Sequence, residues 1–178
     1  MSDRGIDALA EAILEVPDFP KPGILFLDIL PLLKDPILLE TLTKKLSAFV
    51  QNVDSVVGIE ARGFILGTAM ALDLRKGFVP LRKKGKLPGP VHSQSYGLEY
   101  GNDEIEVQDG VLFPGERIVL VDDVLATGGT LIAGVKLLQK CGVVIESVIV
   151  AIEIAALNGR ELFELEHPDI PLHALIIK

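Results

Sequence analysis

The chain has 178 residues, of which 49% are hydrophobic and 24% are charged, a size typical of one compact domain with its own core. We therefore expect a single domain over residues 1–178 rather than two. The formal net charge is −8 at pH 7. This charge argues against a protein that binds nucleic acids or anionic membranes, because such binding needs an excess of Lys and Arg.

The distribution of cysteine and of apolar residues bears on the cell compartment. Cys141 is the only cysteine in the sequence, so an internal disulfide and a thiolate metal cluster are both excluded. Residues 1–15 carry acids where a secretory signal would be basic. The most apolar stretch, residues 143–157, contains charged residues and falls short of the roughly 20 apolar residues of a membrane span. We expect a cytoplasmic protein.

The first third of the chain contains signals for two helices. Apolar spacing over residues 6–14 predicts a first helix, which is followed by a proline-stiffened link and a short extended run at residues 24–28. Asp35 is then placed to cap a helix that begins at Pro36 and runs to about Val50.

The middle of the chain alternates between strand and helix signals. Residues 55–60 predict a buried strand and residues 61–74 a helix. The helical spacing turns four apolar residues toward the core: Ile65, Leu66, Ala69 and Leu72. A strand at residues 77–81 leads into a basic, Gly- and Pro-rich stretch, which we expect to be an extended loop up to about Tyr96. Alternating apolar residues near Ile105 indicate that the chain then returns as a strand.

Three further elements complete the pattern. Residues 117–123 predict a central strand, residues 130–140 a helix and residues 144–154 a last buried strand. Strands that alternate with helices indicate an α/β fold with a mostly parallel central sheet flanked by helices.

The strongest chemical signal lies where the central strand ends. Asp122 and Asp123 are adjacent carboxylates at the edge where open α/β sheets bind ligands. Such a pair can accept hydrogen bonds from both hydroxyls of a ribose diol. The T-G-G-T sequence at residues 127–130 then leads into a helix, whose first N–H groups favour a phosphate. Together these features predict a site for ribose 5-phosphate. An Asx-rich turn that caps an ordinary helix is the alternative.

The same segment, V-L-V-D-D-V-L-A-T-G-G-T, resembles the phosphoribosyl pyrophosphate motif of the type I phosphoribosyltransferases, in the version of the members that act on adenine. Four other segments agree with this family: P-D-F-P-K-P-G-I at 17–24, G-I-E-A-R-G-F at 58–64, R-K-K-G-K-L-P-G at 82–89 and L-E-Y-G at 98–101. The resemblance spans most of the chain. It implies the type I phosphoribosyltransferase fold, with a small hood and a flexible loop that closes over the ligands.

The resemblance also implies a reaction and its residues. A pentosyl group passes from 5-phospho-α-D-ribose 1-diphosphate to adenine, giving AMP and pyrophosphate, with Mg²⁺ held mainly through substrate oxygens. The residues implied for the ribose and its 5-phosphate are Asp122, Asp123, Ala126, Thr127, Gly128, Gly129 and Thr130. Those implied for the pyrophosphate are Arg62, Arg82, Lys83 and Lys86, and those for the base are Leu25, Phe26, Leu27, Val124 and Tyr100. Glu99 and Arg62 are implied as catalytic residues.

Several of these assignments have a simpler alternative. The basic run at residues 82–86 is also typical of a solvated surface, although a polyanionic leaving group needs local cations. Glu99 depends on the resemblance, since an isolated loop carboxylate is usually solvated. Leu27 stands where the family has Arg. If backbone groups read the base, this change leaves recognition intact; if the Arg braces a neighbouring subunit or the pyrophosphate, affinity or subunit contacts differ.

The family also implies a cis peptide bond between Glu60 and Ala61 and a homodimer, and a positive mean hydropathy of +0.43 agrees with a covered apolar surface. Two other functions remain open. One is transfer to a 6-oxopurine, orotate or another base. The other is a regulator that senses the phosphoribosyl donor without catalysis, against which the retained Glu99 and the basic run argue.

Overall fold

The computed structural model describes residues 4–98 and 101–178. By its internal contacts the chain divides into two compact units, Met1–Lys45 and Leu46–Lys178, which are described separately. The single domain expected from the chain length stays a prediction. Within the described ranges, no helix has both the length and the apolar character needed to cross a membrane.

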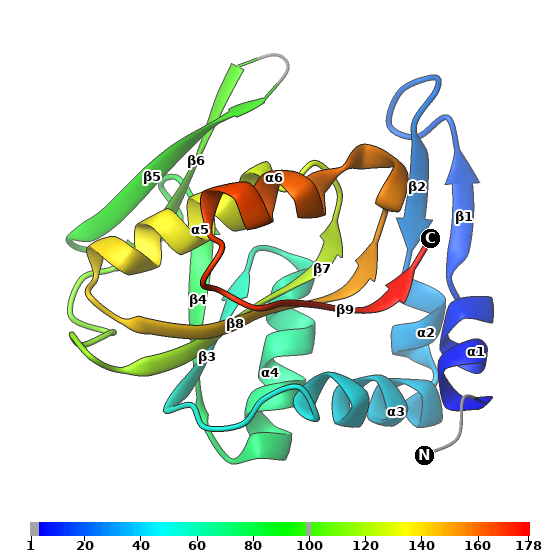
Figure 1. The fold of residues 1–178 in the computed structure, drawn as a ribbon, viewed down its shortest axis with the longest axis horizontal. Coiled ribbons are helices and arrows are strands. Elements are labelled where there is room, and N and C mark those ends of the chain that lie inside the picture. The colour runs from blue at the N-terminus through cyan, green and yellow to red at the C-terminus, as the bar shows by residue number, and fades with distance from the viewer. Residues whose placement is uncertain (1–3, 99–100) are drawn as a thin grey trace. The chain divides into compact units, whose positions relative to one another are not determined.

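The first unit combines short helices with a small β-hairpin (Figure 1). Its elements are α1 (Arg4–Glu11), β1 (Leu14–Pro17), β2 (Leu25–Asp28), α2 (Leu30–Lys34) and most of α3 (Pro36–Ser47). The prediction for this unit is partly wrong, because the first helix ends at Glu11 and the next residues pair as an antiparallel strand with β2. The Asp18 carboxylate accepts a hydrogen bond from the Gly23 N–H at 2.7 Å and closes the turn that the prolines were expected only to stiffen.

The helix cap predicted at Asp35 is confirmed. Its carboxylate accepts hydrogen bonds from the N–H groups of Ile37 and Leu38, at 2.8 and 3.0 Å, which are otherwise unpaired donors of the first turn of α3. The helix ends at Ser47, slightly earlier than the predicted end near Val50.

The second unit is built on a seven-stranded sheet with the order β5-β6-β4-β3-β7-β8-β9. Its strands are β3 (Ser55–Ile59), β4 (Gly77–Lys83), β5 (Val91–Leu98), β6 (Gly101–Gln108), β7 (Arg117–Leu125), β8 (Val144–Glu153) and β9 (Leu172–Ile177). The five strands from β4 to β9 in this order are parallel, whereas β5 and β6 form an antiparallel hairpin whose β6 pairs with β4. The mostly parallel sheet expected from the sequence is confirmed.

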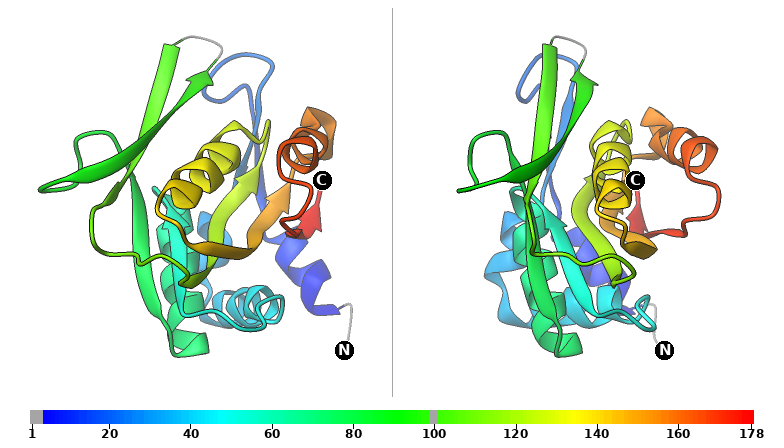
Figure 2. Two further views of the ribbon diagram at one scale, coloured as in Figure 1. Left: turned by 60° about the vertical axis from the view of Figure 1, so that its left-hand side comes forward. Right: turned by 90° about the vertical axis from the view of Figure 1, so that its left-hand side faces the viewer.

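Helices cover both faces of this sheet (Figure 2). They are α4 (Arg62–Leu74), α5 (Gly129–Lys140) and α6 (Gly159–Glu166), with a short 3₁₀ turn, η1 (Ala155–Leu157), before α6. Gly134 of α5 faces Leu120, Ile59 and Leu81, while Gly67 of α4 faces Phe78 on the opposite side of the same strands. The core cluster that α5 shares with the sheet is buried and, apart from Phe163, its buried members are aliphatic.

The predicted inner face of α4 is partly wrong. Leu66 is buried as expected, but Ile65 is 44% and Leu72 is 76% exposed. The two glycines of the buried strip let the helix backbone approach the sheet closely, and the whole strip is Gly63, Leu66, Gly67, Met70 and Ala71. Hydrophobic spacing misplaced part of this face because it gives no weight to glycine, although Gly63 and Gly67 belong to the contact.

The segment between β4 and β6 also differs from expectation. Residues 91–98 form strand β5 rather than a loop, paired along its whole length with β6. Its sequence is mostly polar and lacks the alternation of apolar and polar residues that predicts a strand. The returning strand near Ile105 is confirmed, and the sequence provided no expectation for η1, α6 or β9.

Candidate active site

Three neighbouring parallel strands end at one edge of the sheet and bring the predicted site residues together. In the register of the sheet, Ile59 of β3 lies beside Leu81 of β4, and Gly58 lies beside Val121 of β7. The residues that follow these pairs, including Arg82 and Asp122, therefore lie at the same carboxyl edge. This is the edge at which α/β sheets bind their ligands.

The acid pair is buried at the end of β7. Asp122 is 8% and Asp123 is 6% exposed, and the Asp122 carboxylate accepts a hydrogen bond from the Asp123 N–H at 2.9 Å. The first residue of α4, Arg62, places its Nε 2.8 Å from Asp123 Oδ2 in an ion pair. Gly63 permits this approach, because a Cβ there would lie 2.7 Å from the carbonyl oxygen of Val121.

The environment shifts the titration of both acids. Burial raises the pKa of Asp122 well above its ordinary value, and the neighbouring Asp123 charge raises it further. Burial also raises the pKa of Asp123, although the Arg62 guanidinium opposes the shift. The pair is thus an electrostatically costly arrangement that donors or a cation from a ligand would relieve.

The segment predicted to bind the 5-phosphate, residues 126–130, lines a small cavity directly after the acid pair and is called the phosphate loop below. The cavity has a volume of about 70 Å³ and is lined by Asp122 and residues 124–131. Gly128 has a φ of 86°, in the left-handed region that favours glycine, and the helix α5 begins at the next residue. The first N–H groups of a twelve-residue helix thus border the cavity, as a phosphate site requires.

The basic run folds back on Glu60, at the end of β3. Arg82 Nε lies 3.2 Å from Glu60 Oε2, and the Lys83 N–H donates to the same oxygen at 2.9 Å. Burial alone would raise the pKa of Glu60, but these donors, with the charges of Arg82 and Lys86, lower it. Sequence reasoning missed Glu60, whose contacts arise from strands that are adjacent in space and some twenty residues apart in the chain.

A cross-strand contact joins β5 and β6 two residues before their pairing ends at Leu98 and Gly101. The Tyr96 hydroxyl donates to Asp103 Oδ2 at 3.1 Å, and Lys83 Nζ lies 3.0 Å from the same oxygen. Burial raises the pKa of Tyr96, and a hydrogen bond with Thr130 of the phosphate loop lowers it in part. The hairpin is therefore connected both to β4 and to the start of α5. Glu99 and Tyr100, which follow β5 in the sequence, lie outside the described residues.

The residues implied for the base belong to both units. Leu25 is 49% exposed on β2, whereas Leu27, which replaces the family Arg, is 3% exposed. Phe26 packs edge-on against Phe19 with ring centroids 5.1 Å apart. In the second unit, Val124 is half-buried on β7. The assignment of these side chains to a base pocket stays a prediction.

Comparisons with known proteins decide the family. A model of the phosphoribosyl transferase domain matches residues 33–168. The chain belongs to the phosphoribosyltransferase family. The adenine phosphoribosyltransferase of Synechococcus sp. (strain JA-3-3Ab) is 51% identical over 165 residues, which cover 91% of this chain and 93% of the relative.

Solved structures agree with this assignment. The adenine phosphoribosyltransferase from Rhodothermus marinus has a TM-score of 0.92 and 42% identity, covering 99% of this phosphoribosyltransferase and 100% of that chain. The enzyme from Saccharomyces cerevisiae, complexed with D-2,5-dideoxy-2,5-imino-altritol 1,6-bisphosphate and adenine, has a TM-score of 0.91 and 33% identity, covering 98% and 99% of the two chains. The predicted family, the type I fold and the enzyme class, pentosyl transfer, are confirmed. The cis peptide bond predicted between Glu60 and Ala61 is also present.

Proposed function

We propose that this phosphoribosyltransferase transfers the 5-phosphoribosyl group of 5-phospho-α-D-ribose 1-diphosphate to adenine, giving AMP and pyrophosphate in purine salvage. The observation that carries the proposal is the buried acid pair followed directly by the glycine-rich cavity at the end of β7. It suits a sugar diol and a phosphate on one ligand. The choice of adenine rests on the similarity to adenine phosphoribosyltransferases over most of the chain.

In this reaction the bond between the anomeric carbon and the pyrophosphate oxygen breaks, and a bond from that carbon to N9 of adenine forms. The ribose ring gains positive charge as the leaving group departs. Asp122 and Asp123 would accept hydrogen bonds from the ribose hydroxyls and stabilise this positive charge. The N–H groups at the start of α5 would bind the 5-phosphate. Arg62, Arg82, Lys83 and Lys86 would stabilise the charge on the pyrophosphate.

Two residues outside the described ranges would complete the site. Glu99 would assist the loss of the N9 proton or stabilise the ribosyl cation, and Tyr100 would close over the ligand. They follow β5, in which Tyr96 contacts Asp103 at 3.1 Å and lines a pocket together with Gly129. Closure of the β5–β6 hairpin would exclude water and prevent hydrolysis of the activated sugar.

Mg²⁺ is the cofactor that we propose. The carboxylate oxygens of Asp122 and Asp123 are hard donors that fit this hard cation, and pyrophosphate and ribose oxygens of the substrate would supply most of its ligands. Among residues 4–98 and 101–178, no group of three or more His, Cys, Asp or Glu side chains is arranged to hold a metal. When bound, the ion would neutralise charge on the pyrophosphate.

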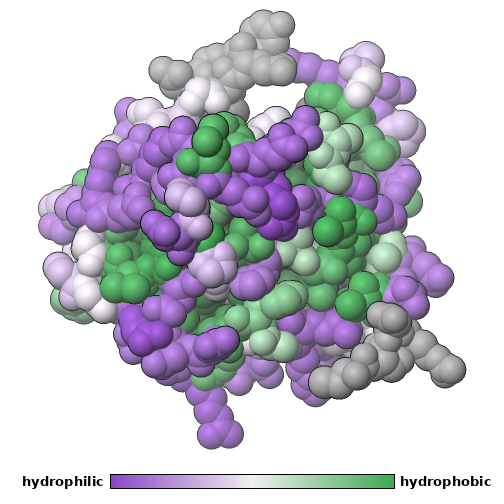
Figure 3. Space-filling model, in the orientation of Figure 1, coloured by the Kyte–Doolittle hydropathy of each residue, from purple (hydrophilic) through white to green (hydrophobic). Residues whose placement is uncertain are grey.

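We also propose that the enzyme is a homodimer and works in the cytoplasm. Ile65 and Leu72 lie two turns apart on the outer side of α4, and both are large, apolar and exposed. Apolar side chains also reach the surface on the opposite face of the sheet, the side of α5 and α6 that Figure 3 shows. A second copy of the chain that covers α4 would remove Ile65 and Leu72 from water. The cytoplasmic location rests on the sequence argument from Cys141.

The choice of base is tested by initial velocities at a fixed concentration of the donor and Mg²⁺. We expect turnover with adenine and at least about a hundredfold less with hypoxanthine, guanine or orotate. Faster turnover with a 6-oxopurine would favour the alternative transferase. Binding of the donor without turnover of any base would favour the sensing regulator.

A further inference from the structure

The segment after β8 touches the phosphate loop backbone to backbone. A Cβ on Gly159, the first residue of α6, would overlap the carbonyl oxygen of Ala126 and lie 2.9 Å from the Gly128 nitrogen. A Cβ on Gly128 would in turn lie 2.8 Å from the carbonyl oxygen of Gly159. Neither position accepts a side chain without movement of the backbone. The two glycines thus allow the start of α6 to pack directly against the loop.

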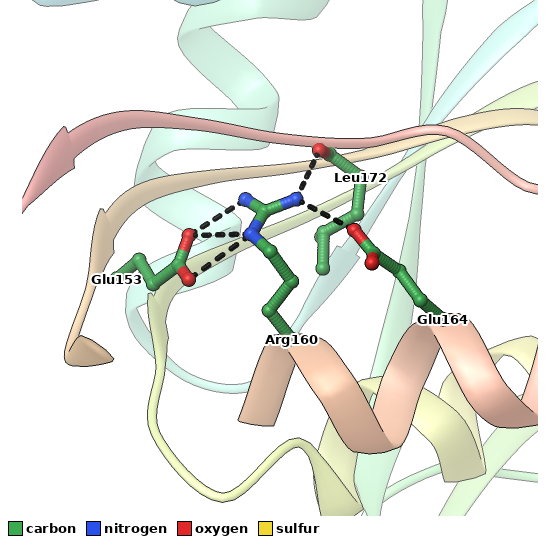
Figure 4. Close-up of polar contacts among 4 residues, drawn as sticks. All are labelled: Glu153, Arg160, Glu164 and Leu172. Carbon is green, nitrogen blue, oxygen red and sulfur yellow. Dashed lines mark hydrogen bonds and ion pairs between the residues drawn. The ribbon is translucent and has the colours of Figure 1, made fainter. Parts of the chain in front are cut away.

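The next residue, Arg160, fixes this start of α6 to the sheet (Figure 4). Its Nε lies 3.0 Å from both carboxylate oxygens of Glu153, and its Nη2 lies 2.6 Å from Oε2. Its Nη1 donates to Glu164 Oε1 at 3.2 Å and to the carbonyl oxygen of Leu172 at 3.0 Å. The planar guanidinium therefore joins β8, α6 and β9 through charge-assisted hydrogen bonds.

Glu153 connects this network to the loop. It is 6% exposed and lies at the end of β8, in register with Leu125 of β7. Leu125 immediately precedes Ala126, and its carbonyl oxygen accepts a hydrogen bond from the Ile154 N–H at 2.9 Å. Arg160 thus holds the strand end from which the loop departs, while Gly159 contacts the loop itself.

We propose that Gly159 and Arg160 are positioning residues that hold residues 126–128 in the shape that binds the 5-phosphate of the donor. This inference rests on the proposed function, because it takes the loop to be the phosphate site. Preorganised N–H donors lose much of their effect when they move by a fraction of an ångström. The contacts of Gly159 and Arg160, called the brace below, therefore affect the affinity for the phosphate rather than the affinity for the base.

The first variant to test is Gly159→Ala, with Gly77→Ala as the matched control. Gly77 begins β4, and a Cβ there meets nothing within 4 Å. We expect Gly159→Ala to raise the KM for the donor about tenfold or more while the KM for adenine changes less than about twofold. The control is expected to leave both unchanged. Equal rises in the two KM values, or no rise, would overturn the proposal.

The second variant is Arg160→Lys, which keeps the charge but loses the planar fork. It is expected to shift the donor KM in the same direction, and it decides the question if Gly159→Ala does not fold. Its control is Arg117→Lys, at an arginine whose Nη2 lies 3.0 Å from Glu146 Oε2 at the other end of β7 and β8. A donor KM that is equal in Arg160→Lys and the wild type would contradict a role for the fork.

Calorimetric titration with ribose 5-phosphate separates this inference from the proposed function, because it needs no turnover. We expect the Kd to be about tenfold or more higher in Gly159→Ala than in Gly77→Ala, with both variants titrated below their melting temperatures. If the wild type binds ribose 5-phosphate but turns over no base, the proposed function fails and the brace is still tested. Unchanged affinity in a folded Gly159→Ala variant would refute the brace.

Discussion

Asp122 and Asp123 lie side by side in the interior, and Arg62 pairs with the second of them at 2.8 Å. We expect Asp122→Asn and Asp123→Asn each to keep the fold and to lose at least about two orders of magnitude in kcat/KM, the scale of losing one preorganised electrostatic contact. Circular dichroism checks the fold and steady-state kinetics the activity. Turnover near that of the wild type in both variants would contradict the role of the pair in binding the ribose.

The same pair predicts how stability depends on pH. A carboxyl group whose pKa is raised by folding binds its proton more tightly in the folded protein, so the free energy of unfolding falls as pH rises from the ordinary value of 3.8 through the raised one. The groups that face Asp122 are Asp123, which adds to this loss, and Arg62, which reduces it.

Asp122→Asn is therefore expected to melt at a higher temperature than the wild type at about pH 8, with a difference that narrows as pH falls toward the ordinary carboxyl value. Asp169→Asn, at an exposed carboxylate before β9, is the control. Thermal unfolding of the ligand-free proteins across this pH range tests the sign. If the difference in melting temperature between Asp122→Asn and the wild type widened toward acid pH, burial would not raise the pKa of Asp122.

Among single residues, the sequence predicted those whose role depends on neighbouring residues in the chain. The acids at the end of an apolar run, the T-G-G-T before a helix and the Asp35 cap each depend on neighbours in the chain. Glu60 and Gly159 could not be found in this way, because their partners, Arg82 and Ala126, are brought near only by the pairing of strands and the packing of α6.

The elements show a similar division. The buried strands β3, β7 and β8 were predicted because parallel strands covered on both faces have continuous apolar runs. The inner face of α4 was predicted only in part, since it packs partly through glycines. Strand β5 was not predicted, since its sequence is mostly polar. Both lie beside the site, where Gly63 and Tyr96 serve close approach and hydrogen bonding rather than burial.

Glu99, which follows β5 in the sequence, is the subject of a further prediction. Glu99→Gln keeps the size of the side chain and removes its charge, so we expect it to lower kcat far more than it raises the KM for adenine. Glu104→Gln is the matched control, because Glu104 belongs to the β5–β6 hairpin and pairs with Lys84 Nζ at 2.7 Å. An unchanged kcat with a raised KM for adenine would make Glu99 a binding residue, and unchanged values of both would remove it from the site.

At the scale of the whole molecule, the exposed side of α4 makes the oligomeric state testable. We expect the scattering mass of the wild type at micromolar concentration to be that of two copies. Leu72→Glu is expected to shift it toward one copy, since a charge would be buried in the interface. Leu165→Glu, at a residue of α6 that is 79% exposed, is expected to leave the mass unchanged. A monomeric wild type, or equal effects of the two variants, would contradict the proposed interface.

The central claim is that the carboxyl edge of this sheet transfers a phosphoribosyl group to adenine. Quantifying AMP and pyrophosphate together, in a reaction of purified protein with adenine, the donor and Mg²⁺, tests it most directly. We expect the two products to accumulate in equal amounts, and neither to accumulate with the Asp122→Asn/Asp123→Asn double variant. No AMP from the wild type, or pyrophosphate released without AMP, would contradict it.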